Sequence, residues 1–256
     1  FRFRHLTILK NLTIAFPEWS KHRKIKVGRH SIFHLCYNFL EFCLLPFCGK
    51  RWLGKQVIFH GFENYEKARA KGKGVLILTL HIGNGDMAIA AIALKYNRLY
   101  VISKKFRNRF INQLWFGVRE KMGTHFIDPH GRSTAFDILR ACKQNDSVVF
   151  VIDQFMGKPF GIETRFFGRR TGTAYGLALF SLKTKAPVVP MYTYRDDQGR
   201  IHVVCDPEIV AETETAPDRD LQIQKMTQKY NDKVEDIVRR HPEQWMWVHR
   251  RWKTWE

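Results

Sequence analysis

Alternation of strand-like and helix-like segments constrains the fold of this chain more than any other feature. Short apolar runs of strand length recur between longer segments whose apolar residues follow helical spacing. The predicted strands are residues 56–60, 75–80, 99–103, 148–153, 188–194 and 201–205. The predicted helices are residues 86–96, 111–121, 133–142, 174–184 and 221–240. This order predicts an α/β fold: a single domain with a mostly parallel central sheet flanked by helices.

The segment from His81 to Asp86 joins one predicted strand to the following helix. Gly83 and Gly85 allow the chain to turn, so the imidazole and the carboxylate can face each other. A carboxylate that accepts the Nδ1 proton of an imidazole leaves Nε2 free as a base toward a hydroxyl or a water. The alternative is an ordinary helix start, in which Asn84 is the N-cap and Asp86 interacts with the helix dipole.

A second carboxylate, Asp153, ends the predicted strand 148–153, and Gln154 follows it. Functional groups in parallel sheets gather at the carboxyl ends of the strands. We therefore expect His81 and Asp153 at one edge of the sheet. The alternative is that Asp153 and Gln154 are only a polar strand end.

The charge balance is strongly basic and indicates an anionic partner. The chain has 43 Lys and Arg against 24 Asp and Glu, a net charge of +19. Nucleic acid, an anionic membrane surface and a phosphorylated substrate all fit such an excess. Arg165, Arg169 and Arg170 flank the sequence Phe-Phe-Gly, and an arginine fork suits phosphate geometry. Arg132 is a further candidate for a phosphate contact. A further basic cluster, residues 104–109, follows a predicted strand.

The first fifty residues differ from residues 51–256, which form the predicted α/β domain. A basic cluster over residues 21–29 precedes an aromatic and aliphatic segment over residues 33–47. This order is typical of a helical segment that lies on an anionic bilayer, and we expect residues 1–50 to be such a membrane-associating segment. The alternative is a helix packed on the core, with a solvated charge run before it. No stretch is apolar enough for a transmembrane helix, and an anchor ahead of residue 1 stays open.

Tryptophans and cations alternate near the C-terminus, from Trp245 to Lys253. This pattern fits a bilayer interface, stacking on nucleic-acid bases, or a buried tail docked on the sheet. The five cysteines include no C-x-x-C pair, which indicates reduced thiols and argues against a zinc site.

Five ordered blocks together resemble the late acyltransferases of bacterial lipid A biosynthesis, the lauroyl/myristoyl acyltransferase family. They are residues 11–18 (NLTIAFPE), 73–84 with the strand and His81, 153–168 with Asp153-Gln154 and FFG, 186–190 (APVVP), and 242–254 (PEQWMWVHRRWKT). The resemblance covers nearly the whole chain. Two positions depart from it: the family usually has Asn-Trp-Glu at residues 84–86, and many members have an acidic residue where Phe155 stands here.

The resemblance implies transfer of a fatty acyl chain from acyl carrier protein or coenzyme A to a hydroxyl of an anionic glycolipid. It implies an enzyme that acts at the cytoplasmic face of the bacterial inner membrane. We expect no metal or other cofactor. We expect His81 to be the general base and Asp86 to orient it. Asn84, Arg132, Asp153, Gln154, Arg165 and Arg169 are the expected substrate-binding residues.

The sequence also fits three other functions. A lysophospholipid or other glycolipid acyltransferase fits the same blocks, since aspartate at position 86 is typical of the wider glycerolipid acyltransferases. A basic nucleic-acid-binding module fits the charge, although no recognised nucleic-acid motif is present, so we expect no nucleic-acid partner. A hydrolase that directs the same histidine and aspartate at water fits the His81 segment but not the family blocks.

Overall fold

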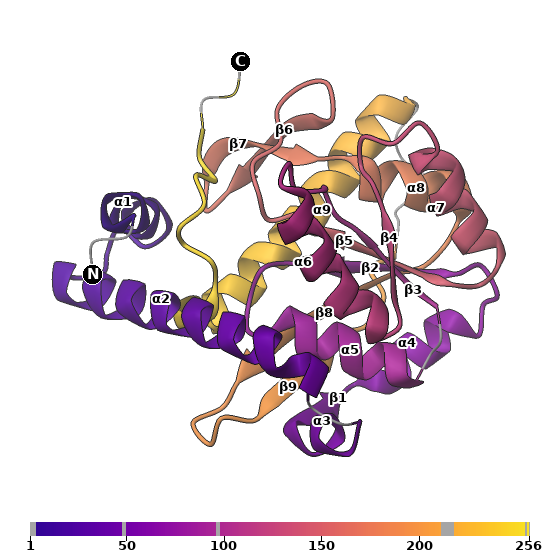
Figure 1. Cartoon of the computed structure of the whole chain (residues 1–256). Coiled ribbons are helices and arrows are strands. Elements are labelled where there is room, and N and C mark those ends of the chain that lie inside the picture. The colour runs from indigo at the N-terminus through magenta and orange to yellow at the C-terminus, as the bar shows by residue number, and fades with distance from the viewer. Residues whose placement is uncertain (1–3, 48–49, 96–97, 211–217, 254, 256) are drawn as a thin grey trace.

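A seven-stranded sheet is the centre of the molecule (Figure 1). The computed structural model describes residues 4–47, 50–95, 98–210, 218–253 and 255. Within them the strand order is β1-β9-β8-β2-β5-β3-β4. The strands are β1 (Val57–His60), β2 (Val75–Thr79), β3 (Leu99–Ile102), β4 (Thr124–Ile127), β5 (Ser147–Val151), β8 (Val188–Arg195) and β9 (Ile201–Cys205). Only the β8–β9 pair is antiparallel, so the predicted mostly parallel sheet is confirmed.

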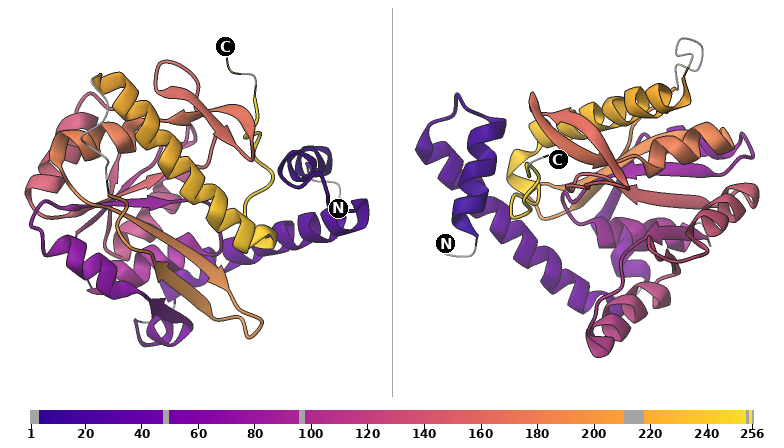
Figure 2. Two further views of the ribbon diagram at one scale, coloured as in Figure 1. Left: turned by 180° about the vertical axis from the view of Figure 1, so that it is seen from behind. Right: turned by 90° about the horizontal axis from the view of Figure 1, so that it is seen from above.

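Helices cover both faces of this sheet (Figure 2). They are α1 (His5–Ala15), α2 (Lys21–Leu44), α3 (Lys50–Gln56), α4 (Phe62–Arg69), α5 (Gly85–Lys95), α6 (Arg109–Lys121), α7 (Thr134–Lys143), α8 (Gly176–Thr184) and α9 (Arg219–Arg240), with short 3-10 turns η1 (Leu45–Phe47) and η2 (Pro242–Gln244). One buried cluster contains residues of α1, α7, α8 and α9. The other contains residues of α3, α4, α5 and α6, together with Phe42 near the end of α2.

The six predicted strands are present, with ends shifted by at most two residues, and so are the five predicted helices. The predicted end of the first helix at Tyr96 lies outside the described residues. Three features were not predicted: the short strand β4, the helices α3 and α4, and the antiparallel hairpin of β6 (Gly161–Phe166) and β7 (Arg169–Ala174). The hairpin sequences mix glycine, threonine and charged residues, so they carry little hydrophobic periodicity.

The N-terminal segment is helical and packs on the rest of the chain. Ile8 and Leu12 of α1 have no exposed surface, and they belong to the same cluster as the C-terminal tryptophans. The predicted basic cluster lies in the first turns of α2, where Lys24 is buried and donates to the Pro17 carbonyl. In the described parts of the chain, no helix combines the length and the apolar character that crossing a bilayer requires.

Residues 245–251, here called the C-terminal strap, run between α2 and the β6–β7 hairpin (Figure 1). Trp245, Trp247 and Arg251 are at most 1% exposed. The Arg251 guanidinium donates to the Gly172 carbonyl at 2.5 Å and to Thr173 Oγ1 at 2.7 Å. The buried-tail alternative for this tryptophan-rich segment is therefore confirmed.

Asn11 ties the N-terminal helix to the C-terminal strap. Its buried Nδ2 donates to the carbonyls of Trp247 at 2.8 Å and His249 at 2.7 Å. Asn11→Ala should lower the free energy of unfolding by roughly 2–3 kcal/mol, because two carbonyls lose their donor. Urea unfolding of the variant, beside the exposed Lys10→Ala on the same helix, measures this loss. Equal stability of the two variants would contradict a structural role for Asn11.

Candidate active site

The parallel register of β2 and β5 brings His81 and Asp153 together. Thr79 pairs with Val151, so the residues two places further along each chain lie opposite each other just beyond the strand ends. His81 Nδ1 lies 2.8 Å from Asp153 Oδ1, and the His81 backbone N–H donates to Asp153 Oδ2 at 2.9 Å. The prediction that both residues lie at one edge of the sheet is confirmed.

Burial differs sharply between the two partners and sets their electrostatics. The Asp153 side chain is 2% exposed, whereas the His81 side chain is 41% exposed. Loss of hydration opposes the imidazolium, but the charge and hydrogen bond of Asp153 outweigh it and raise the pKa of His81 above its usual 6.5. Burial alone would raise the pKa of Asp153, but His81 and the Trp245 hydrogen bond lower it to about 2. Asp153 is therefore a carboxylate at neutral pH.

The C-terminal strap forms hydrogen bonds to both Asp153 and His81. Trp245 Nε1 donates to Asp153 Oδ2 at 2.7 Å, and the Met246 N–H donates to the His81 carbonyl at 3.1 Å. The N–H of Phe155 donates to His249 Nε2 at 3.1 Å, and burial lowers the pKa of that imidazole to about 4. Because Oδ2 is taken by Trp245 and the His81 backbone, Oδ1 is left for the imidazole.

Asp86 makes a different contact from the one expected. Its carboxylate accepts from Arg119 Nε of α6 at 2.6 Å, and the Arg119 guanidinium stacks 4.3 Å above the Trp115 ring. The predicted hydrogen bond from His81 to Asp86 is thus corrected to Asp153. Asp86 stands in the first turn of α5, where Arg119 binds its carboxylate. Asp153, in contrast, lies opposite His81 because of the register of β2 and β5. Asp86 still raises the pKa of His81 through its charge.

Asn84 has the capping contact that the alternative interpretation of the His81 segment predicted. Its Oδ1 accepts from the Met87 N–H at 3.1 Å, and its Nδ2 donates to Glu41 Oε2 of α2 at 2.6 Å. Asn84 is 2% exposed, and both ends of its amide are engaged within the protein. Asn38 of α2 also donates to the Gly83 carbonyl.

Gly83 is required by the close approach of this loop to β8. Its φ is +55°, and a Cβ at this position would lie 2.5 Å from the Thr193 carbonyl oxygen. Thr193 Oγ1 donates to the Ile82 carbonyl at 2.7 Å, which holds the loop against the strand.

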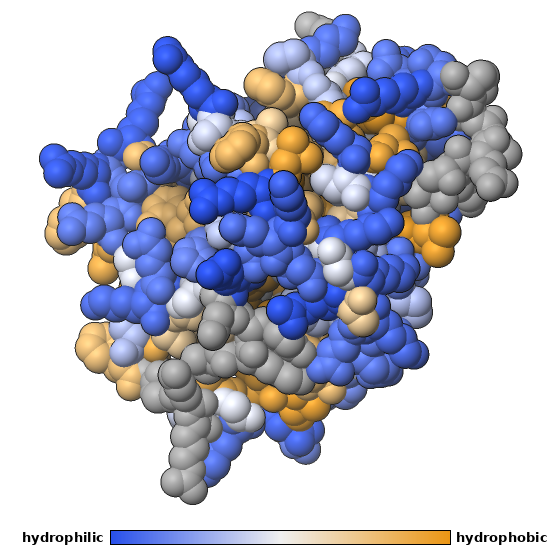
Figure 3. All heavy atoms as spheres, turned by 90° about the vertical axis from the view of Figure 1, so that its right-hand side faces the viewer, coloured by the Kyte–Doolittle hydropathy of each residue, from blue (hydrophilic) through white to orange (hydrophobic). Residues whose placement is uncertain are grey.

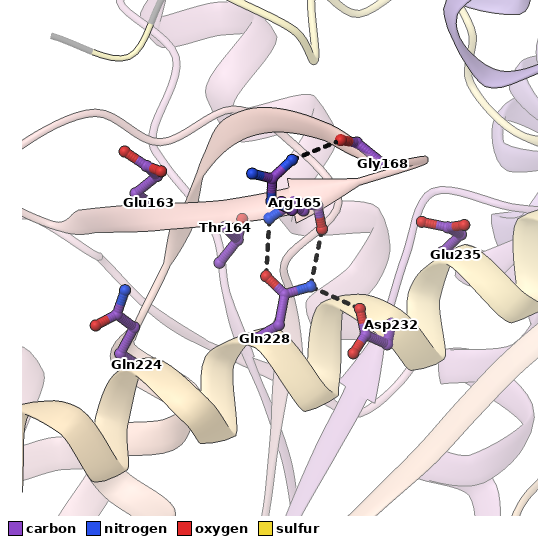
Figure 4. Close-up of a pocket in the computed structure, with 8 residues that line it drawn as sticks. All are labelled: Glu163, Thr164, Arg165, Gly168, Gln224, Gln228, Asp232 and Glu235. Atoms are coloured by element: carbon purple, nitrogen blue, oxygen red, sulfur yellow. Dashed lines mark hydrogen bonds between the residues drawn. The ribbon is translucent and has the colours of Figure 1, made fainter.

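Arg165 lies in a pocket between β6 and α9, and His81 is not among the residues that line this pocket (Figure 4). Its backbone N–H donates to Gln228 Oε1 at 2.8 Å, and its guanidinium donates to the Gly168 carbonyl at 3.1 Å. Three carboxylates share this pocket, those of Glu163, Asp232 and Glu235. They weaken the positive potential that a phosphate would require.

The remaining predicted substrate-binding residues stay predictions. Arg169 is exposed at the start of β7, and Arg132 is exposed in the segment between β4 and α7. Gln154 is half-buried beside Asp153, and its carbonyl accepts from Arg251 Nη1 at 3.3 Å. The described cysteines, Cys36, Cys43, Cys142 and Cys205, are free thiols, whereas Cys48 lies outside the described residues.

This geometry is that of a histidine imidazole oriented by a buried carboxylate. Nδ1 is engaged by Asp153, so the free ring nitrogen, Nε2, belongs to an imidazole that is partly accessible from solvent. Such a nitrogen can remove the proton of a hydroxyl or a water that reacts with a carbonyl. The arrangement is chemically compatible with the transfer of a group from a carbonyl to a hydroxyl or to water.

Comparison with known proteins agrees with this chemistry. A model of the family described as bacterial lipid A biosynthesis acyltransferase matches residues 2–254. The chain belongs to this family, and it is an enzyme that transfers acyl groups.

The similarity to individual relatives is distant but extends along most of the chain. The lipid A biosynthesis acyltransferase of Haemophilus influenzae is 21% identical, over 93% of this chain and 72% of the relative. The lipid A biosynthesis palmitoleoyltransferase of Escherichia coli K12 is 23% identical, over 96% of this chain and 77% of the relative. The phosphatidylinositol mannoside acyltransferase of Mycobacterium tuberculosis H37Rv is 22% identical, over 81% of this chain and 64% of the relative.

Asp153→Asn should lower the acyl-transfer rate by roughly 10²–10⁴-fold, because an amide cannot stabilise the imidazolium. The pKa of His81 should also fall, since Asp153 supplies the largest effect that raises it. A neutral imidazole is the active form, so the rise of rate with pH should move to lower pH in the variant. A pH–rate profile beside exposed Asp232→Asn measures both changes. An unshifted profile with full activity would remove Asp153 from the site.

Trp245→Phe should keep the aromatic packing of the strap but remove the indole donor to Asp153 Oδ2. We expect a rate loss of about tenfold, with KM for both substrates changed little, because the carboxylate is held less firmly. Steady-state kinetics on folded protein separates kcat from KM. A loss confined to KM would show that Trp245 acts on substrate binding instead.

Proposed function

We propose that this enzyme moves a fatty acyl chain from a thioester, carried by acyl carrier protein or coenzyme A, to a hydroxyl of an anionic glycolipid. A lipid A precursor is the proposed acceptor. The observation that carries the proposal is the partly exposed imidazole of His81 on the buried carboxylate of Asp153, in a chain of the lipid A acyltransferase family.

The proposed reaction proceeds in two steps at one base. His81 Nε2 takes the proton of the acceptor hydroxyl as the oxygen attacks the thioester carbonyl, and a tetrahedral oxyanion forms. The C–S bond then breaks, and the leaving thiol takes the proton back from His81. The products are an ester and a free thiol, and no protein nucleophile, metal or other cofactor takes part. Asp153 holds the imidazole and stabilises its charged form between the two steps.

Asp86 supports this base indirectly in the proposed mechanism. Its ion pair with Arg119 fixes the start of α5 against α6, and its charge adds to that of Asp153 in favouring the imidazolium. Arg132 and Arg169 remain candidates for phosphate contacts. Arg165 is the weakest of the three, because carboxylates surround it.

A second acceptor is supported by two observations. A relative named as a phosphatidylinositol mannoside acyltransferase is about as similar to this chain as the lipid A enzymes. Asp86 also replaces the glutamate that the resemblance would place there. Another phosphorylated glycolipid or a lysophospholipid is therefore the alternative acceptor for the same chemistry.

The proposed location is the cytoplasmic face of the bacterial inner membrane, where anionic lipid and acyl donor meet. Nucleic-acid binding is disfavoured, because Trp245 and Trp247, two rings that could stack on bases, are buried.

His81→Ala should reduce transfer by at least about 10²-fold while leaving the fold intact, because the imidazole is not part of the core. The assay follows transfer of a radiolabelled acyl group from acyl carrier protein to purified acceptor lipids, with His22→Ala on the exposed side of α2 as the control. Mass spectrometry of membrane lipids with and without the gene identifies the acceptor and the added chain. Full activity of a folded His81→Ala protein would contradict the proposal.

A further inference from the structure

The outer face of α2 carries a row of exposed apolar side chains. Phe33, Tyr37, Leu40 and Leu44 follow each other at intervals of three or four residues, so they lie on one side of the helix. Their exposed fractions are 62%, 39%, 59% and 56%, and Phe47 in η1 continues the row at 85%. From Phe33 to Phe47 the row is about 20 Å long at 1.5 Å per residue. Ser31 and Phe42 of the same helix are buried on the opposite side.

A second exposed apolar group lies on α6 and the loop before it. Phe106, Phe110 and Leu114 are 44%, 75% and 60% exposed. Exposed cations stand between and beside them, namely Lys104, Lys105, Arg107 and Arg109. Aromatic and aliphatic side chains interspersed with cations suit the boundary between lipid headgroups and acyl chains.

The two groups flank the loop that carries His81. Phe42 of α2 and Trp115 of α6 are in ring contact at 4.4 Å, so the two helices meet at this point. α2 holds this loop through Glu41 and Asn84, and α6 holds the start of the following helix α5 through Arg119 and Asp86. The exposed surfaces of α2 and α6 therefore lie next to the segment that carries the candidate active site.

We propose that the outer row of α2, together with residues 104–114, is a docking face for an anionic lipid bilayer. The inference rests on the proposed function and assigns the membrane-facing side of the same site. The four cations match an anionic leaflet, and the apolar side chains enter the acyl boundary without needing a shaped partner surface. Figure 3 shows the side that carries α7 and α8, where hydrophilic residues predominate and apolar areas are small and separate.

The inference changes which residues face the membrane. The basic cluster of residues 21–29 lies at the other end of α2, where Lys24 is buried and Arg23 covers the Trp19 ring at 4.0 Å. The bilayer is instead met by the second half of α2 and by a segment of the α/β domain far away in the sequence. Docking there places a lipid hydroxyl near His81 without extraction of the whole lipid into solvent.

The experiment measures binding to vesicles by sedimentation at physiological salt. One set of vesicles is pure phosphatidylcholine, and the other contains phosphatidylglycerol as the anionic probe. The anionic lipid is about one lipid in three, which is enough to attract polybasic segments. The double variant Leu40→Glu/Phe110→Glu should lower the partition coefficient on anionic vesicles by at least about tenfold. Phe136→Glu, an exposed phenylalanine of similar exposure on α7, is the matched control and should bind as the wild type does. Replacing the four cations by glutamine should remove the preference for anionic over neutral vesicles.

Transfer to an acceptor dispersed in detergent separates this inference from the proposed function. The Leu40→Glu/Phe110→Glu variant should keep that activity, and His81→Ala should keep vesicle binding while it loses activity. Unchanged vesicle binding of the double variant would overturn the docking face and leave the acyl transfer intact. Weaker binding of acidic acyl carrier protein, with vesicle binding unchanged, would assign the face to the donor protein and equally overturn the bilayer.

Discussion

The hydrogen bond between His81 Nδ1 and Asp153 Oδ1 is the interaction on which the rest of the site depends. It joins the ends of two neighbouring parallel strands, β2 and β5, and it decides which ring nitrogen faces outward. The surrounding structure serves this pair. The indole of Trp245 directs the carboxylate, the Met246 backbone holds the His81 carbonyl, and α2 anchors the loop that follows. A partly exposed imidazole is thus held by a buried carboxylate that is itself hydrogen-bonded.

The blocks that resemble the acyltransferase family acquire a physical meaning in this arrangement. Asn11, from the first block, caps the carbonyls of the C-terminal strap, which belongs to the last block. The strap in turn reaches Asp153 of the third block and His81 of the second. Segments that are far apart in the sequence therefore converge behind one hydrogen bond. What they contribute in this arrangement includes support for the His81–Asp153 pair.

The sequence was sufficient for six of the seven strands of the central sheet, for the position of His81 and for the edge that Asp153 shares with it. Buried strands and strand ends leave local signals, whereas the short strand β4 did not. It was not sufficient for the partner of His81. Asp86 was the nearest carboxylate along the chain, but Asp153 is the nearest one in space, and strand register is a non-local property. The capping of α5 by Asn84 was available as an alternative because N-caps are local. The contact of Asp86 with Arg119 depends on the packing of α5 against α6, for which no local pattern exists.

The pairing of His81 with Asp153 is tested most directly by the state of the imidazole itself. Nitrogen NMR of histidine-labelled protein, with His81→Ala used to assign the signal, reports both the tautomer and the titration of His81. The structure predicts a neutral form that carries its proton on Nδ1 and a pKa above 6.5, because the buried Asp153 carboxylate stabilises both the Nδ1 proton and the imidazolium. A neutral form protonated on Nε2, or a pKa below 6.5, would contradict the proposed base and its partner.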